Sequence, residues 1–395
     1  MTLQRWKLPS KATNPGCMDL DSRYPAISDL RRRARQRIPH FVWEFLDSAT
    51  GDEATTTRNR QALDQVLLRP SVLHGEISPD LTTKFLGRTY AAPFGIAPVG
   101  MSGLVWPNAE RLLAQVAGEK NIPFGLSTVA TQTPEDIGPI SSGNGWFQLY
   151  PPRDLKILGS MLARIREAGF NTLVLTVDVP VASRRERQTR SGLRTPPKLT
   201  PRLLAQIVCC PAWAIGILKQ GMPRMRFIDD FTSPAAGLSS TAHAGYLLRT
   251  SPDWDYLHHL REVWNGPLIV KGVLDPNTAI RLKSEGVDAI WVSNHAGRQF
   301  AAAPATIDAL GPIRAALGDT YPLIMDSGIE SGLDILRAFA NGADFVMLGR
   351  AFHYGLGAFG KRGATHVVDI LKADLTANMG QMGIIRLGEA SNRLL

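Results

Sequence analysis

The sequence predicts an α/β protein built on one closed (β/α)8 barrel, and three observations lead to this fold class. First, a phrase recurs: a segment of helical character ends at Gly169, Gly286 or Gly342, and a short apolar run follows each glycine. Glycine readily takes the left-handed conformation that ends a helix, and a short apolar run is typical of a strand. Second, eight such runs occur and most are continuously apolar, which indicates parallel strands covered on both faces. Third, strands and helices alternate along the chain, which favours a closed barrel over an open sheet.

The predicted strands follow one another at the spacing of a barrel. They comprise residues 93–98, 124–128, 146–150, 172–178, 267–272, 289–294, 322–328 and 345–350. The segment before Gly169 is expected to be a helix with one buried face, because Leu158, Met161, Leu162 and Ile165 recur at helical spacing.

Two regions fall outside the alternation. Residues 1–90 precede the first strand and are expected to form a helical and irregular cover. Residues 184–251 separate the fourth and fifth strands and are too long for a simple connection. No linker divides the chain, so we expect a single domain over residues 1–395, with the barrel in residues 91–395 and residues 184–251 as an inserted loop.

Composition is that of an ordinary globular protein, with 44% hydrophobic and 20% charged residues. Cys17, Cys209 and Cys210 show neither metal-ligand spacing nor an even disulfide set, which fits a reducing compartment. The N-terminus lacks the apolar core of a secretory signal. No apolar run reaches the roughly 18–20 residues of a spanning helix, and Pro211 interrupts the longest one, Ile207–Leu218. We therefore expect a soluble or peripheral protein.

The net charge of +9 is unevenly placed, since seven basic residues and one acid, Glu186, lie between Arg184 and Arg202. Such a stretch suits nucleic acid, but we find no nucleic-acid-binding motif and no interleaved aromatic residues, so we expect no nucleic-acid partner. The alternative is a solvated loop. We interpret Arg187, within this stretch, as an ordinary surface charge.

Polar or glycine residues stand at the carboxyl end of nearly every predicted strand. Barrel enzymes place their chemistry at this rim, so the sequence predicts a binding site there. In chain order these residues are Pro98, Val99, Gly100, Ser127, Gln148, Tyr150, Thr176, Asp178, Lys271, Ser293, Asn294, His295, Asp326, Ser327, Gly328, Gly349 and Arg350.

The last two strands indicate that the ligand carries a phosphate. Gly328 and Gly349 allow backbone amides to approach it, and Arg350 supplies charge. Lys271 is either a Schiff-base nucleophile or a cation that steadies an anionic cofactor ring, and the surrounding hydroxyl and amide groups favour the second role.

Two other motifs are not expected to form a nucleotide-binding or metal-binding site. Gly355-Leu-Gly357-Ala-Phe-Gly360 matches a dinucleotide fingerprint but lies in the expected final helix rather than on a strand-to-helix turn. His258 and His259 lack suitable metal partners and are assigned to a helix surface, so we expect no metal.

Four motifs together resemble the FMN-dependent 2-hydroxy-acid oxidase and dehydrogenase family. They are Ser-Asn-His295-Ala-Gly-Arg298-Gln, Trp-Phe-Gln148-Leu-Tyr150, Leu-Thr176-Val-Asp178-Val-Pro and Val-Lys271-Gly. The likeness runs from about Ile38 to near the C-terminus, and the motif around His295 is quite specific.

The resemblance implies FMN as cofactor and oxidation of an L-2-hydroxy acid, lactate-like or mandelate-like, to the 2-oxo acid. By resemblance His295 is the base, Asp178 holds its imidazole, Tyr150 contacts the substrate oxygen, and Arg185 and Arg298 grip the substrate carboxylate. The chemistry agrees, because histidine titrates near neutral pH and arginine binds a carboxylate in bidentate fashion. Whether the hydroxyl proton or the α-proton leaves first stays open.

Three positions depart from the family pattern. Phe45 aligns with a substrate-binding tyrosine, Glu330 takes the place of a phosphate-binding arginine, and Phe300–Ala303 lacks an acidic residue. We therefore expect a different or more apolar substrate, bordered by Phe45, Val129 and Ala182, and FMN either bound more weakly or held by Arg350 and backbone amides. The departures also admit a hypothesis of another class, a flavin-binding protein without turnover.

Two further features bear on the electron acceptor and the location of the protein. A glycine at position 100 is similar to the residue found in the quinone-linked dehydrogenases of the family, which indicates a quinone acceptor. The alternative is an oxidase that passes the electrons to O2 and forms H2O2. The apolar segment 203–218 is flanked by cations, which suits peripheral contact with an anionic bilayer; these are Arg194, Lys198, Arg202, Lys219, Arg224 and Arg226. We expect the cytoplasmic side of the inner membrane, or else the cytoplasm, and a homo-oligomer, a tetramer by resemblance.

Overall fold

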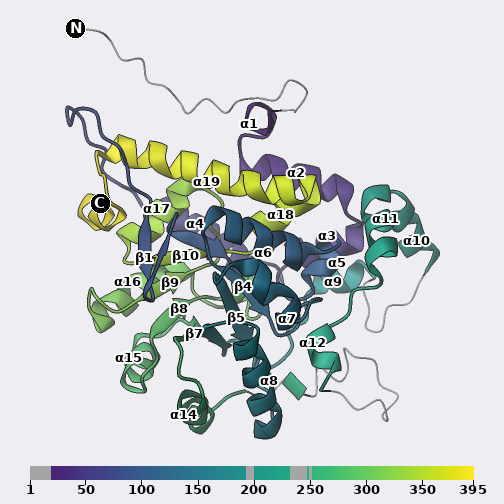
Figure 1. Ribbon diagram of the computed structural model, residues 1–395. Coiled ribbons are helices and arrows are strands. Elements are labelled where there is room, and N and C mark those ends of the chain that lie inside the picture. Colours follow the sequence, from purple (N-terminus) through teal and green to yellow (C-terminus); the bar gives the residue numbers. More distant parts are fainter. Residues whose placement is uncertain (1–18, 193–199, 232–246, 249–250) are drawn as a thin grey trace.

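The barrel is closed by eight parallel strands in the order β10-β3-β4-β5-β6-β7-β8-β9 (Figure 1). This computed structural model describes residues 19–192, 200–231, 247–248 and 251–395. The barrel strands are β3 (Phe94–Ile96), β4 (Phe124–Ser127), β5 (Gly145–Leu149), β6 (Thr172–Thr176), β7 (Leu268–Val273), β8 (Ala289–Val292), β9 (Leu323–Met325) and β10 (Phe345–Leu348). All eight predicted strands are confirmed, and so is the barrel.

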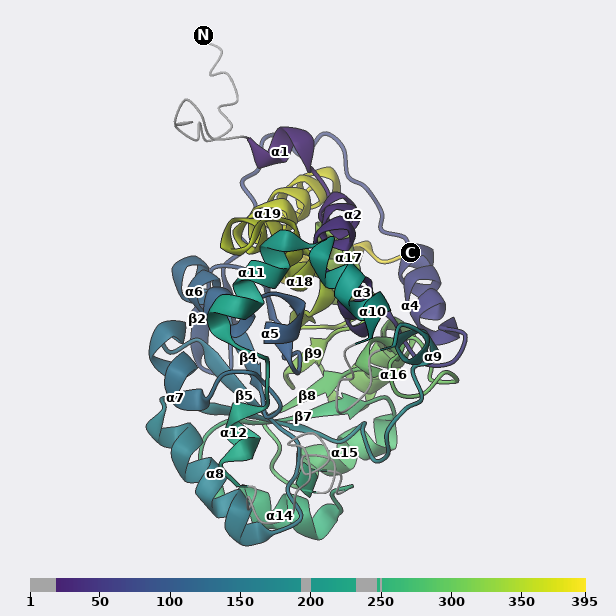
Figure 2. The same ribbon diagram turned by 90° about the vertical axis from the view of Figure 1, so that its right-hand side faces the viewer.

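Helices follow the strands and cover the outside of the barrel (Figures 1 and 2). They are α5 (Ser102–Val105), α6 (Ala109–Lys120), α7 (Pro134–Ile137), α8 (Leu155–Glu167), α14 (Trp254–Val263), α15 (Pro276–Ser284), α16 (Thr306–Leu317), α17 (Gly332–Ala340), α18 (Arg350–Phe359) and α19 (Lys361–Met382). Short 3-10 turns occupy Gly138–Ser141, His295–Gly297 and Leu387–Arg393. Helix α8 buries the four residues expected of it. The 355–360 glycine motif lies in α18 and ends it at Gly360, but α18 is not the final helix, because α19 turns back and packs on it.

A hairpin of β1 (Thr83–Phe85) and β2 (Arg88–Tyr90) corrects the expectation that residues before the barrel are only helical and irregular. Its side chains Phe85 and Tyr90 are buried in one apolar cluster with Trp146 and Phe345. The Trp146 indole donates a hydrogen bond to the Tyr90 hydroxyl over 3.2 Å. The hairpin therefore closes the barrel interior with aromatic side chains.

The N-terminal cover consists of α1 (Leu20–Arg23), α2 (Ile27–Arg37), α3 (His40–Asp47) and α4 (Ala54–Gln65). Helices α2 and α3 pack on α18, and α4 packs on α16 and on the turn that holds His295. The cover thus reaches the carboxyl ends of the last strands, where the predicted site lies.

The insertion after β6 carries α9 (Glu186–Arg190), α10 (Pro201–Val208), α11 (Pro211–Gln220) and α12 (Arg226–Asp229). Among the described residues no single helix is long and apolar enough to span a membrane; α10 and α11 together have the length and composition, but they are bent by 103°. Cys209 and Cys210 are free thiols. Cys17, Arg194 and Lys198 lie outside the described residues.

The aromatic interior of the barrel gives a stability prediction. Phe345 is fully buried, so Phe345→Ala should lower the free energy of unfolding by about 3–5 kcal/mol through lost apolar burial and a residual cavity. Phe300 is 65% exposed, and the matched change Phe300→Ala should stay within about 0.5 kcal/mol. Urea unfolding followed by fluorescence measures both, and equal effects of the two changes would contradict the assignment of Phe345 to the core.

Candidate active site

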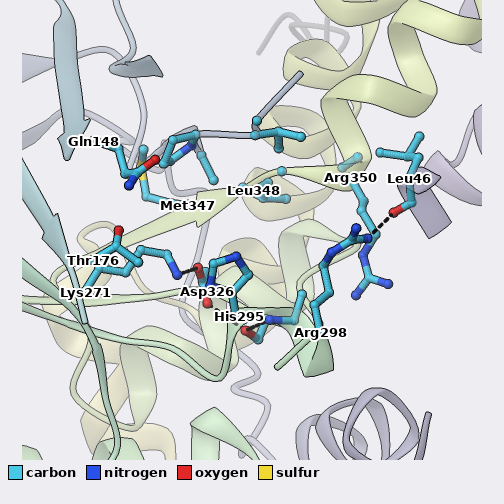
Figure 3. A pocket seen from close by; sticks show the side chains of 18 of the residues that line it. Leu46, Gln148, Thr176, Lys271, His295, Arg298, Asp326, Met347, Leu348 and Arg350 are labelled. Carbon is cyan, nitrogen blue, oxygen red and sulfur yellow. Dashed lines mark hydrogen bonds and ion pairs between the residues drawn. The ribbon is translucent and has the colours of Figure 1, made fainter. Parts of the chain in front are cut away.

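A cavity of ≈ 280 Å³ opens at the carboxyl ends of the barrel strands and is completed by α3, α18 and the insertion. Figure 3 shows Gln148, Thr176 and Lys271 on one side of it and Arg298 and Arg350 on the other. Of the predicted site residues, these line the cavity: Pro98, Val99, Gly100, Gln148, Tyr150, Thr176, Arg185, Lys271, His295, Arg298, Asp326, Ser327, Gly328, Gly349 and Arg350. The structure therefore brings together residues from seven strand ends and one loop.

Three predicted residues stand behind the lining and hold it. Ser127 donates to Gln148 Oε1 over 2.7 Å. Ser293 Oγ accepts from Lys271 Nζ over 2.8 Å and from the His295 backbone N–H over 3.1 Å. Asp178 contacts His295. Asp178 thus holds the imidazole of His295, as the resemblance implied, whereas Ser127 and Ser293 are not among the residues that line the cavity.

His295 is oriented by a carboxylate. Its Nδ1 lies 2.8 Å from Asp178 Oδ1, so Nδ1 carries the proton and Nε2 keeps a lone pair toward the cavity. The backbone at His295 is left-handed, with φ of 55°. Asn294 stabilises this turn, since its Oδ1 accepts from the Gly297 N–H and its amide pairs with Asn59. Backbone strain held by a hydrogen-bonded turn is common at active sites.

The electrostatics favour a neutral imidazole beside an ionised carboxylate. Burial raises the pKa of Asp178, but His295 and Lys271 outweigh it and hold that pKa at about 2. Burial lowers the pKa of His295, Asp178 opposes the shift, and Lys271 adds to it, so the pKa lies below the ordinary value. At neutral pH His295 is therefore poised to accept a proton.

Lys271 is a buried cation with two carboxylates in reach. Its Nζ lies 3.5 Å from Asp178 and 3.6 Å from Asp326. Burial lowers the pKa of Lys271, yet Asp178 and then Asp326 more than compensate and raise it above the ordinary value. A lysine that stays protonated is a poor nucleophile, so the structure favours the cation role over the Schiff base.

Arg298 is anchored to backbone carbonyls and retains a free edge. Its Nη1 donates to Leu46 O (3.1 Å) and Ser48 O (2.9 Å), and its Nη2 donates to Phe45 O (2.8 Å). A guanidinium has five N–H groups, so the Nε–H and the second Nη2–H remain. These two N–H groups form the parallel fork that binds a carboxylate.

Arg185 and Arg350 add to an excess of positive charge. Within the described residues, Arg185 has only Ser183 as a side-chain hydrogen-bond partner, and Arg350 has only the Asp47 carbonyl, at 3.3 Å. Neither forms an ion pair with a described carboxylate. Burial and then the nearby Arg185 and Arg350 lower the pKa of Arg298 well below its ordinary value. Cations placed this close require anions, which a carboxylate substrate and a phosphate provide.

The cavity also fits a flavin. The buried Gln148 Nε2 and Thr176 Oγ1 have no hydrogen-bond partner within the described residues, and Ser127 fixes the Gln148 amide so that Nε2 is free. These atoms and Lys271 suit the polar edge of a flavin ring. A Cβ on Gly349 would approach Val99 Cγ2 to 3.2 Å, and Gly328 has a φ of 93°. Gly328, Gly349 and Arg350 suit the phosphate end.

Sequence reasoning missed or misplaced several residues. Phe45 and Val129 border the cavity as expected, but Ala182 is exposed and absent from the lining. Met225 of the insertion and Tyr354 of α18 line it instead. Tyr354 was detectable as a helical neighbour of Arg350, four residues on, whereas no local pattern marks Met225.

Two further interpretations are corrected or completed. Arg187 is not an ordinary surface charge, because its guanidinium lies among the carboxylates of Glu44, Asp47 and Glu53. The segment Phe300–Ala303, which lacks the family's acid, is held by α4 through its carbonyl groups: Thr55 donates to Phe300 O and Ala301 O.

The fold and the cavity define a class of protein, a (β/α)8-barrel flavoenzyme with a histidine base and an arginine-rich anion site. Comparison with known families agrees: the sequence model described as FMN-dependent dehydrogenase matches residues 34–395. The chain therefore belongs to the FMN-dependent dehydrogenase family, and FMN is its cofactor. The resemblance stated from the motifs is confirmed.

Individual relatives cover nearly the whole chain. The L-lactate dehydrogenases of Pseudomonas syringae pv. syringae (strain B728a) and Caulobacter vibrioides (strain NA1000 / CB15N) are each 36% identical over 94% of this chain, and the chain covers 98% and 97% of them. The solved structure of the monotopic membrane protein (S)-mandelate dehydrogenase superposes with a TM-score of 0.89 at 32% identity, covering 94% of this chain and 98% of that one. A mandelate oxidase structure gives 0.80 at 30% identity, covering 94% and 98%.

Glu330 gives a prediction about cofactor affinity. It lines the cavity near the phosphate end and is exposed, and its backbone N–H donates to Asp334 over 3.0 Å. Glu330→Gln removes a negative charge from this end, so FMN should bind about two- to fivefold more tightly. Flavin fluorescence quenching measures the affinity.

Riboflavin, which lacks the phosphate, is the control and should bind both forms equally. The gain for FMN should also shrink at 1 M salt, where exposed charges are screened. An equal gain for riboflavin would show that Glu330 does not act through the phosphate.

Proposed function

We propose that this protein oxidises an L-2-hydroxy acid, lactate-like or mandelate-like, to the 2-oxo acid. One observation carries the proposal: His295, Arg298 and Arg185 line one cavity, in which Asp178 orients the imidazole. A 2-hydroxy acid offers the matching groups on adjacent carbons, a carboxylate and a hydroxyl. The names of the relatives, lactate and mandelate dehydrogenases, support this substrate class.

The reaction removes two electrons and two protons from the substrate carbon and its oxygen. Arg298 and Arg185 hold the carboxylate and thereby fix the distance from the reacting carbon to His295. His295 Nε2 takes one proton, and Asp178 stabilises the imidazolium that forms. Tyr150 lines the same cavity and is positioned to contact the substrate oxygen. FMN, when bound, would take up the two electrons and the second proton, and Gln148, Thr176, Lys271 and Arg350 are the residues that would hold it.

The shape of the cavity supports a substrate with an apolar side chain. Phe45, Val129 and Met225 line it, and Phe45 lacks the hydroxyl of the family's tyrosine. These side chains leave the carboxylate and hydroxyl as the polar groups to be recognised, with the rest of the substrate in apolar surroundings.

We further propose a quinone-type acceptor, with O2 as the alternative. Gly100 supports the first, because a Cβ at this position would meet Val129 Cγ2 at 2.6 Å; the family's oxidases tend to carry alanine there. Reduction of a soluble quinone analogue without peroxide formation is the expected result. Stoichiometric peroxide would instead identify an oxidase.

Peripheral attachment to the cytoplasmic side of the inner membrane is part of the same proposal, with the cytoplasm as the alternative location. Helices α10 and α11 lie on the outside beside α3 (Figure 2). These helices and Met222, two residues after α11, expose large apolar side chains; in the helices these are Leu204, Val208, Ile215 and Leu218. A related structure is that of a monotopic membrane protein. A homotetramer remains a proposal from the family resemblance alone.

The function test is an anaerobic absorbance spectrum of the FMN-loaded protein. Addition of L-lactate or (S)-mandelate should bleach the flavin absorbance in the wild type. A chain that binds FMN and is not bleached by any L-2-hydroxy acid would instead be the flavin-binding protein without turnover.

The His295–Asp178 pair gives a prediction about pH. Because neutral His295 is the active base, kcat/KM should fall as the pH drops below the lowered pKa of His295. Asp178 raises that pKa, so Asp178→Asn should move the acid limb to lower pH. The plateau should fall by about a hundredfold or more, since the imidazolium loses its partner. An acid limb that moves to higher pH would contradict the role of Asp178.

Membrane contact is tested with a quadruple serine variant of Leu204, Val208, Ile215 and Leu218. This variant should lose co-sedimentation with vesicles of phosphatidylglycerol and phosphatidylcholine by more than about tenfold, because four apolar anchors are removed.

Serines at four other exposed apolar positions are the control and should leave vesicle binding unchanged. They replace Leu67, Val72, Leu73 and Ile280. Equal loss of vesicle binding in both variants would show that any exposed apolar side chains contribute, and would contradict a specific role of α10 and α11.

A further inference from the structure

The turn after α3 supports both arginines that grip the substrate. We call residues 44–53 the α3 turn. Its carbonyls at Phe45, Leu46 and Ser48 receive all three anchoring hydrogen bonds of Arg298. The position of the carboxylate fork on Arg298 therefore depends on the position of this turn, and Figure 3 shows Arg298 directed to Leu46.

Arg187 holds the α3 turn from the insertion. Its guanidinium makes a paired contact with Glu44 (2.7 and 3.1 Å), a second with Glu53 (2.8 and 3.0 Å), and a contact with Asp47 at 3.2 Å. Glu44 and Asp47 are buried. Arg187 thus contacts three carboxylates on one turn, and all five contacts lie 134 residues or more apart in sequence.

Asp47 is held in its charged form, so its contact with Arg187 is ionic. Burial raises the pKa of Asp47, but the Arg31 guanidinium and the Tyr354 hydroxyl outweigh it and leave the pKa below its usual range. Asp47 Oδ1 accepts from Arg31 Nη2 and from Tyr354 Oη, each over 2.8 Å. With Oδ1 occupied in this way, Oδ2 is left for Arg187.

The second substrate arginine is fixed by the same contacts. Arg185 stands two residues before Arg187 and has a left-handed backbone, with φ of 45°. Glu186, between them, accepts the Gly51 backbone N–H of the α3 turn over 2.8 Å. Arg185 is therefore followed by two residues that are both tied to the turn on which Arg298 rests.

We propose that Arg187 is a positioning residue for the carboxylate site: it sets the spacing between Arg185 and Arg298 by fixing both to the α3 turn. The inference rests on the proposed function, because that function makes the two arginines a carboxylate site. A purely structural ion cluster would stabilise the protein without changing carboxylate affinity relative to FMN affinity. The two readings therefore differ in what they predict for substrate binding.

The test compares FMN-loaded wild type with Arg187→Met and Arg187→Lys. Oxalate, an unreactive carboxylate, is titrated while the flavin absorbance is followed, and FMN affinity is measured separately. Arg187→Met should weaken oxalate binding by between about ten- and a hundredfold, because small displacements of positioning groups are costly. FMN affinity should stay within about twofold. With substrate, KM should rise by a larger factor than kcat falls.

Two variants separate positioning from charge and from folding. Arg187→Lys should recover only part of the loss, since one ammonium cannot reproduce paired contacts with two carboxylates. Arg190 is exposed on the same helix, and Arg190→Met removes the same charge; it should keep oxalate affinity within about twofold of the wild type.

If Arg187→Met fails to fold, the triple variant Arg187→Met, Glu44→Gln, Glu53→Gln removes the uncompensated charges and should show the same loss of oxalate binding. Wild-type oxalate affinity in the folded variant would overturn the role of Arg187 alone. Absence of oxalate binding by the wild type would overturn the carboxylate site, and with it the proposed function.

Discussion

One carboxylate, Asp178, connects the ends of three neighbouring strands, and the chemistry of the site depends on it. Its Oδ1 holds His295 after β8, and its Oδ2 lies 3.5 Å from Lys271 on β7. Burying a carboxylate is unfavourable unless it is paired, and here His295 and Lys271 are the two partners. Asp178 fixes the tautomer of His295 and keeps Lys271 charged. Without this bridge the base would lack an orientation and the buried lysine would tend to lose its proton.

The rest of the cavity has more positive than negative side chains, which indicates that its ligands are anions. Arg185, Arg298 and Arg350 have no ion pair with a described carboxylate. An anionic cofactor and an anionic substrate would supply the negative charge that these side chains lack. Glu330 lines the same cavity and reduces that excess of positive charge. The α3 turn binds Arg187 through its carboxylates and anchors Arg298 and Arg350 through its backbone carbonyls.

The fold and the site differed in how far the sequence could predict them. The barrel strands were predictable because burial on both faces leaves an unbroken apolar run, a signal local to each strand. The ring of polar strand ends was predictable because closure of the barrel brings all carboxyl ends to one rim. What could not be predicted depends on contacts distant in sequence. Arg187 sits in a stretch of cations, and nothing local shows that it faces Glu44 and Asp47. The β1–β2 hairpin is only three residues on each strand, too short for a clear alternation, and Met225 lies in an insertion without periodicity. That Ser127 and Ser293 stand behind the lining is likewise a matter of geometry rather than of residue type.

The central claim is that a carboxylate binds between Arg185 and Arg298 with the neighbouring carbon facing His295 Nε2. A crystal structure of the FMN-loaded protein with a bound 2-oxo acid tests it most directly. The account places the ligand carboxylate on the Nε and Nη2 edge of Arg298 and within hydrogen-bond reach of Arg185, with the 2-oxo oxygen within about 3.2 Å of His295 Nε2. A carboxylate bound elsewhere, for example on Arg350, with His295 out of reach of the ligand, would contradict it.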